Sequence, residues 1–158
     1  MLTSQTDASK IVSQQNRCRV NTIQLCNHIA ASTYKRLRSR LPGISLVQVV
    51  HVTGEEAIER ALEVVPNVDA ILLDSGNPNL PERELGGTGR THDWRISRRI
   101  REKVNVPVFL AGGLRPDNVA AAIQEVQPFG VDVCTGVRSE DCLDEAKLAA
   151  FFESVYSA

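Results

Sequence analysis

The sequence predicts an α/β fold made of repeated βα units around a parallel sheet. Short apolar runs rich in Val, Ile and Leu alternate with longer segments of helical period. The apolar runs show little alternation with polar residues, which is typical of strands buried on both faces. Two architectures are built from such units, a doubly wound open sheet and a (β/α)8 barrel, and the pattern alone fits both.

The predicted strands follow one another at intervals of about two dozen residues, except where the loop after Ser75 adds about a dozen. The predicted strands are residues 20–25, 45–52, 68–75, 106–113 and 131–137, with Leu2 and Thr3 as the end of a further strand. The predicted helices are residues 7–16, 32–40, 53–64, 93–103, 117–126 and 143–156. Five of them begin at residues able to cap a helix, namely Asp7, Ser32, Thr53 (in a capping box with Glu56), His92 or Asp93, and Asp117.

Composition predicts a single globular domain spanning residues 1–158. The chain is 42% hydrophobic and 23% charged, and its net charge of -1 gives no bulk field for nucleic acid or an anionic membrane. No apolar run approaches the roughly 20 residues that span a bilayer, and the first residues resemble no signal or transit peptide. We therefore expect a soluble cytoplasmic protein with no nucleic-acid or membrane partner.

The four cysteines do not show the spacing of a metal site or of a disulfide framework. Cys18, Cys26, Cys134 and Cys142 form no CxxC pair and have no histidine at a zinc-ligand spacing. We interpret them as free thiols and expect no metal.

Two predicted strands end in small, glycine-containing turns. Gly112 and Gly113 close one strand, and Cys134, Thr135 and Gly136 close the next. Glycines let the backbone approach an anion closely, and free amides can then hold a phosphate. The alternative is two tight turns that merely need glycine. Because two neighbouring strands end in this way, we favour a phosphate site, as on many barrels.

Asp74 is the carboxylate that ends an otherwise apolar strand, ILLDS. Partial desolvation at that position would raise its pKa and suit it to proton transfer near neutral pH. The alternative is a turn residue that accepts backbone N–H groups from the loop that follows. Position alone leaves both interpretations open.

A long glycine-rich loop follows Asp74. It contains LGGTGRTHDW (residues 85–94), in which Gly86, Gly87 and Gly89 provide hinges while Thr88 and Arg90 provide donors. We predict a lid over an anionic ligand, with a plain connector as the alternative. The glycine spacing differs from the GxGxxG signature of dinucleotide binding.

Three further side chains follow strands but are interpreted as structural. His28 and His51 have no visible nucleophile partner in the sequence, and Cys26 suits a small buried hydrophobe better than a reactive thiol.

Four segments, taken in order, give the chain a resemblance to phosphoribosylanthranilate isomerase, a TIM-barrel family of tryptophan biosynthesis. They are LLDS with Asp74, GGTGRTHDW, LAGGLRPDNV and GVDVCTGVR, and the likeness runs from residue 22 to about residue 152. The resemblance implies an Amadori rearrangement of N-(5-phosphoribosyl)anthranilate to 1-(2-carboxyphenylamino)-1-deoxyribulose 5-phosphate, without metal or cofactor.

The resemblance also implies roles for single residues. Asp74 matches the general acid that opens the ribose ring. The residues that match the phosphate-holding loops are Gly112, Gly113, Cys134, Thr135 and Gly136. The residues that match the loop closing over the substrate are Gly87, Thr88, Gly89 and Arg90.

The likeness departs from the family at the N-terminus. The family's general base is a cysteine in a KxCG-type segment that ends strand 1, and nothing here matches that segment or the arginine for the anthranilate carboxylate. The first residues resemble the end of strand 3, so about six βα units are expected, corresponding to strands 3 to 8. Where strand 4 of the family commonly ends in QLHG, this chain reads QLCN, and we do not transfer the base role to Cys26.

A barrel without two strands has two open edges, for which three explanations remain. We favour the first explanation, that the sequence is part of a longer protein. The others are a homodimer that pairs the open edges, and a shortened relative that binds phosphoribosyl groups without catalysis.

Overall fold

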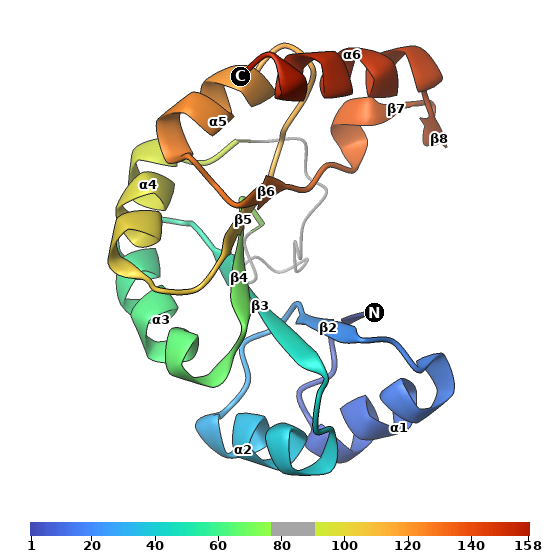
Figure 1. The fold of residues 1–158 in the computed structure, drawn as a ribbon, viewed down its shortest axis with the longest axis vertical. Helices are drawn as coiled ribbons and strands as arrows, with labels where there is room; N and C mark the ends of the chain where they lie inside the picture. The colour runs from blue at the N-terminus through green and yellow to red at the C-terminus, as the bar shows by residue number, and fades with distance from the viewer. Residues whose placement is uncertain (77–90) are drawn as a thin grey trace.

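A computed structural model describes residues 1–76 and 91–158. Six parallel strands form one sheet in which the strand order equals the chain order (Figure 1). They are β1 (Leu2–Thr3), β2 (Thr22–Leu25), β3 (Ser45–His51), β4 (Ala70–Asp74), β5 (Val108–Leu110) and β6 (Gly130–Val131). The helices are α1 (Ala8–Cys18), α2 (Ala31–Arg40), α3 (Glu56–Val64), α4 (Trp94–Lys103), α5 (Val119–Val126) and α6 (Glu145–Tyr156). The predicted series of six βα units is therefore confirmed.

The arrangement is that of an incomplete barrel. Figure 1 shows the helices along the outer side of a curved row of strands, with none on the inner side among the described residues. A doubly wound sheet would carry helices on both faces and reverse its strand order, whereas each strand here pairs with the next one along the chain. Within the described residues, β1 and β6 are edge strands.

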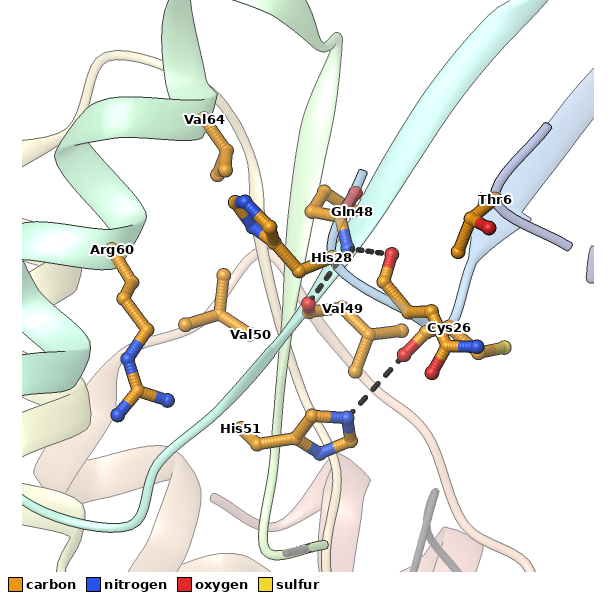
Figure 2. A pocket seen from close by; sticks show the side chains of 10 residues that line it. Thr6, Cys26, His28, Gln48, Val49, Val50, His51, Arg60 and Val64 are labelled. Atoms are coloured by element: carbon orange, nitrogen blue, oxygen red, sulfur yellow. Dashed lines mark hydrogen bonds between the residues drawn. The ribbon is translucent and has the colours of Figure 1, made fainter. Parts of the chain in front are cut away.

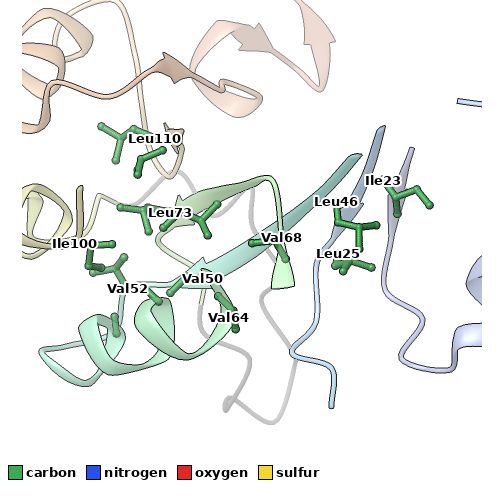
Figure 3. Close-up of a cluster of buried hydrophobic side chains, with 14 of the residues drawn as sticks. Ile23, Leu25, Leu46, Val50, Val52, Val64, Val68, Leu73, Ile100 and Leu110 are labelled. Carbon is green, nitrogen blue, oxygen red and sulfur yellow. The ribbon is translucent and has the colours of Figure 1, made fainter. Parts of the chain in front are cut away.

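The main core lies between the sheet and the helices. Alternate strand residues point into it, and Figure 3 shows several of them, including Leu25, Leu46, Val50, Leu73 and Leu110. The inner face carries a smaller cluster of Val49, Leu72 and Ala111. Because side chains alternate along a strand, His51 shares the inner face with Val49, and Asp74 shares it with Leu72.

The buried side-chain amide of Gln48 links β3 to α2 and to the loop after β2. Gln48 is 1% exposed. Its Oε1 accepts a hydrogen bond from the Tyr34 hydroxyl (2.6 Å), and its Nε2 donates to the carbonyls of Leu25 and Asn27 (3.0 Å each). These bonds hold the loop after β2 against β3. They also satisfy the Gln48 amide, which would cost stability if it were buried without hydrogen-bond partners.

Two predicted helix starts are confirmed and three are corrected. Asp7 Oδ1 accepts from the amides of Ser9 and Lys10, and Asp93 caps α4 in the same way through the amide of Arg95. The predictions at Ser32, Thr53 and Asp117 were wrong, because the observed N-cap residues are Ala30, Glu55 and Asn118.

The predicted capping box at Thr53 fails for a local reason. The Thr53 hydroxyl donates to the Glu56 carboxylate (2.7 Å), so the two side chains bond each other instead of the backbone amides at the helix start.

The predicted strand over residues 131–137 is also corrected. Only Gly130–Val131 pairs with β5, and Thr135–Val137 forms a short 3-10 helix, η2. A small antiparallel hairpin of β7 (Arg138–Ser139) and β8 (Cys142–Leu143) follows, and its two turn residues, Glu140 and Asp141, both have positive φ. After the strand ends, the turn at Gly136 lies against Leu114 in the loop after β5.

Two expectations from composition can be compared with the structure. All four cysteines are free, as predicted. In the described ranges, no helix has both the length and the apolar character needed to cross a membrane.

Candidate functional site

Of the six predicted site residues in the described part of the chain, the structure brings five together at the carboxyl ends of β4, β5 and β6. Asp74, Gly112, Gly113, Cys134 and Thr135 line one small cavity of about 40 Å³. These residues come from three separate βα units, and parallel strands place their carboxyl ends at the same edge of the sheet. The predicted residues Gly86, Gly87, Thr88, Gly89 and Arg90 lie outside the described part of the chain.

Asp74 is a buried carboxyl at the centre of this edge. Its residue is 7% exposed, and its Oδ1 accepts the amide hydrogen of Ser75 at 2.7 Å. Burial raises the pKa of Asp74 above its ordinary value, the Ser75 amide and a charged His51 oppose this, and the charge of Asp132 adds to it. Both sequence interpretations of Asp74 therefore describe part of its surroundings.

Asp132 is a member of the site that the sequence analysis missed. It lines the same cavity as Asp74, and partial desolvation raises its pKa although its side chain remains exposed. A signal for it was present, because Asp132 is the only charged residue in GVDVCTGV and stands two positions before Cys134. The charge of Asp132 raises the pKa of Asp74, so simultaneous ionisation of the two carboxyl groups is disfavoured.

The glycines have a steric role that can be read from the backbone. Gly112 has φ +87°, and a Cβ there would lie 2.6 Å from the amide nitrogen of Ser75. A Cβ on Gly136 would overlap the carbonyl oxygen of Leu114. The loops after β4, β5 and β6 can approach one another only with glycine at these positions. Gly112 and Gly136 are thus required for steric reasons, as the structural interpretation of the glycine turns expected. Their role in phosphate binding stays a prediction.

A second, larger cavity of about 450 Å³ lies beside the ends of β2 and β3. Figure 2 shows its lining, which includes Cys26, His28, Gln48, His51 and Arg60. Burial raises the pKa of the Cys26 thiol, which therefore keeps its proton near neutral pH. This agrees with the interpretation of Cys26 as an unreactive thiol.

His51 has surroundings that the sequence interpretation did not foresee. It is 7% exposed, and its Nε2 lies 3.4 Å from the carbonyl oxygen of Cys26. His51 pairs in register with Asp74 on the neighbouring strand. Burial lowers the pKa of His51, while the charge of Asp74 acts in the opposite direction. The neighbour that the linear sequence did not reveal is thus a carboxyl group on the adjacent strand, to which His51 makes no hydrogen bond among the described residues.

We expect Gly136→Ala to destabilise the protein by about 1–3 kcal/mol, the usual cost of inserting a methyl group into a filled space. Urea unfolding followed by circular dichroism measures the change. The control is Gly54→Ala, where the nearest atom to an added Cβ is the flexible carboxylate end of Glu56. Equal losses in the two variants would contradict the steric role of Gly136.

We expect Asp74→Asn to raise the free energy of unfolding at pH 8. The pKa of Asp74 is higher in the folded than in the unfolded protein, so the buried carboxylate costs stability in full above the folded-state pKa, and this cost is lost as the pH falls to the unfolded-state pKa. The gain over the wild type should therefore shrink as the pH falls from 8 to 4. Asp141→Asn, in the exposed hairpin turn, is the matched control, and a gain independent of pH would contradict this account.

Comparison with known proteins relates the whole chain to one enzyme family. The family described as N-(5'phosphoribosyl)anthranilate (PRA) isomerase matches residues 3–154. An isomerase of that name from Methanocella arvoryzae is 37% identical over 143 residues, covering 90% of this chain and 65% of the relative. The second of two such isomerases from Methanosarcina mazei is 36% identical over 152 residues, covering 96% of this chain and 66% of the relative. The chain thus spans slightly less than two thirds of the length of these curated relatives.

Solved structures give the same result. Phosphoribosyl anthranilate isomerase from Thermotoga maritima aligns with a TM-score of 0.78 at 29% identity, covering 99% of this chain and 72% of that one. The enzyme from Thermococcus kodakaraensis aligns with a TM-score of 0.76 at 30% identity, covering 100% and 74%. Sequence and fold agree over nearly the whole chain, which therefore belongs to the phosphoribosylanthranilate isomerase family.

Proposed function

We propose that this protein converts N-(5-phosphoribosyl)anthranilate to 1-(2-carboxyphenylamino)-1-deoxyribulose 5-phosphate in tryptophan biosynthesis. The observation that carries the proposal is the buried carboxyl of Asp74 beside two glycine turns, in a chain of this family. A phosphoribosyl anthranilate isomerase 26% identical to this chain was solved with the reduced form of that product, which supports the substrate class. We also propose a cytoplasmic location, because reducing compartments preserve free thiols.

Asp74 is the proposed general acid. The rearrangement begins when a proton reaches the ring oxygen of the ribose, the C1–O bond breaks, and a protonated imine forms. A general base then takes the proton from C2, which gives an enolamine, and a proton added at C1 converts the enolamine to the ketone. No residue of this chain is assigned as that base. Because C1 is reduced while C2 is oxidised, no external oxidant or reductant is needed. The raised pKa of Asp74 keeps more of its carboxyl in the proton-donating form near neutral pH.

The turns after β5 and β6 are the proposed phosphate site. In the described residues, the amides of Gly112 and Gly113 donate no hydrogen bond, so they are available to an anion. Cys134, Thr135 and Gly136 approach them from the next turn, held by the close contact of Gly136 with Leu114. Unpaired amides on closely packed turns suit a phosphate group.

We expect Asp74→Asn to lower kcat for phosphoribosylanthranilate by about 10²–10⁴-fold, the usual contribution of general acid catalysis. Chromatography of the product measures turnover, and calorimetry with ribose 5-phosphate measures binding. Asp141→Asn should retain wild-type turnover. Turnover unaffected by Asp74→Asn would reject Asp74 as the acid. Binding by a wild-type chain without turnover would favour a non-catalytic phosphoribosyl-binding protein instead.

We also propose that the isolated chain forms a homodimer through its open edges. β1 and β6 each have one strand neighbour among the described residues, and Leu2 (70% exposed) and Phe129 (73% exposed) lie on or beside them. A Thermotoga maritima isomerase is described as dimeric, which supports association in this family.

Sedimentation velocity over a range of concentrations tests this association. We expect a dimer that dissociates on dilution and that Leu2→Lys weakens. A monomer at all concentrations would contradict the proposal.

A further inference from the structure

His51 and Asp74 occupy equivalent positions at the ends of the two central strands. They are register partners, and the amide of Val52 donates to the Asp74 carbonyl at 2.8 Å immediately beyond them. Each residue is 7% exposed, and both side chains point to the inner face. The backbone therefore holds an imidazole and a carboxyl side by side in a poorly solvated place.

The orientation of the His51 ring leaves one nitrogen free. Nε2 approaches the Cys26 carbonyl (Figure 2), which can only accept a hydrogen bond, so Nε2 carries the proton in the neutral ring. Nδ1 then presents a lone pair. It is buried and has no hydrogen-bond partner among the described residues. A buried acceptor without a partner is uncommon and calls for an explanation.

Burial and two neighbouring charges disfavour the charged forms of His51 and Asp74. Burial is the largest influence on both, and it lowers the pKa of His51 and raises that of Asp74. The other groups that act on them are Arg60, which disfavours the imidazolium, and Asp132, which disfavours the Asp74 carboxylate. The Cys26 thiol beside them keeps its own proton because burial raises its pKa. The protonation of one group of the pair then depends on the protonation of the other.

We propose that His51 and Asp74 act as an electrostatically coupled pair, in which the charge of the neighbouring imidazole governs how readily Asp74 protonates the substrate. In that step, the Asp74 O–H bond breaks as the ring oxygen gains the proton. A proton from solvent then restores the Asp74 carboxyl group. His51 is a positioning residue, because it acts through Asp74. Its use in turnover rests on the proposed function, but the coupling of the two groups does not.

Proton NMR titration of the His51 ring in the substrate-free protein tests the coupling. Removing the neighbouring carboxylate should shift the His51 midpoint to lower pH in Asp74→Asn, and Asp141→Asn should leave it unchanged. Equal midpoints in the wild type and Asp74→Asn would overturn the proposal. Because no substrate is present, this result stands whether or not the protein turns over phosphoribosylanthranilate.

His51→Gln tests the use of the pair in turnover. The glutamine amide can still donate to the Cys26 carbonyl, so a merely structural role survives, whereas the titrating nitrogen is lost. We expect kcat to fall about tenfold with KM unchanged, and the pH profile of kcat to lose one ionisation. A full kcat with the wild-type pH profile in His51→Gln would overturn the proposal. This outcome stays decisive even if Asp74→Asn does not fold. A wild type that does not turn over phosphoribosylanthranilate would reject the proposed function. The NMR titration alone would then decide whether His51 and Asp74 are coupled.

Discussion

The register between β3 and β4 is the constraint on which the rest of the site depends. Five residue pairs, from Val47 with Ala70 to His51 with Asp74, fix the two central strands relative to each other. Strand side chains alternate between faces, so a shift of one residue in β4 would turn Asp74 toward the helices and Leu73 away from the core. The hydrophobic alternation that stabilises the fold thus also aims the acid at the inner face.

The glycine turns show how structural and functional demands share the same residues. Gly112 lets the backbone pass close to Ser75, and Gly136 lets the last turn pack on Leu114. The same close packing brings the two turns to the cavity that contains Asp74. A position that tolerates only glycine for steric reasons is therefore also where the backbone amides gather, and neither role excludes the other.

Most elements could be predicted from sequence because their signals are local. Asp7 and Asp93 cap the helices they precede, and the buried runs around Ile71 and Leu110 are strands. The predictions failed where tertiary contacts outweigh local pattern. The sequence pattern predicts residues 135–137 as the end of an apolar strand, yet they form a 3-10 helix whose Gly136 lies against Leu114. At Thr53, two side chains that suit a capping box bond each other instead.

By itself, the sequence determined the repeated βα units, the position of Asp74 at a strand end, and the family, because each rests on residues close together in the chain. It left open whether the sheet is doubly wound or curved into a barrel, and the strand order decided that. Only the tertiary structure placed His51 and Asp132 beside Asp74. The physical reason is that parallel strands bring together residues far apart in sequence, and the register that selects them depends on the packing of the whole sheet.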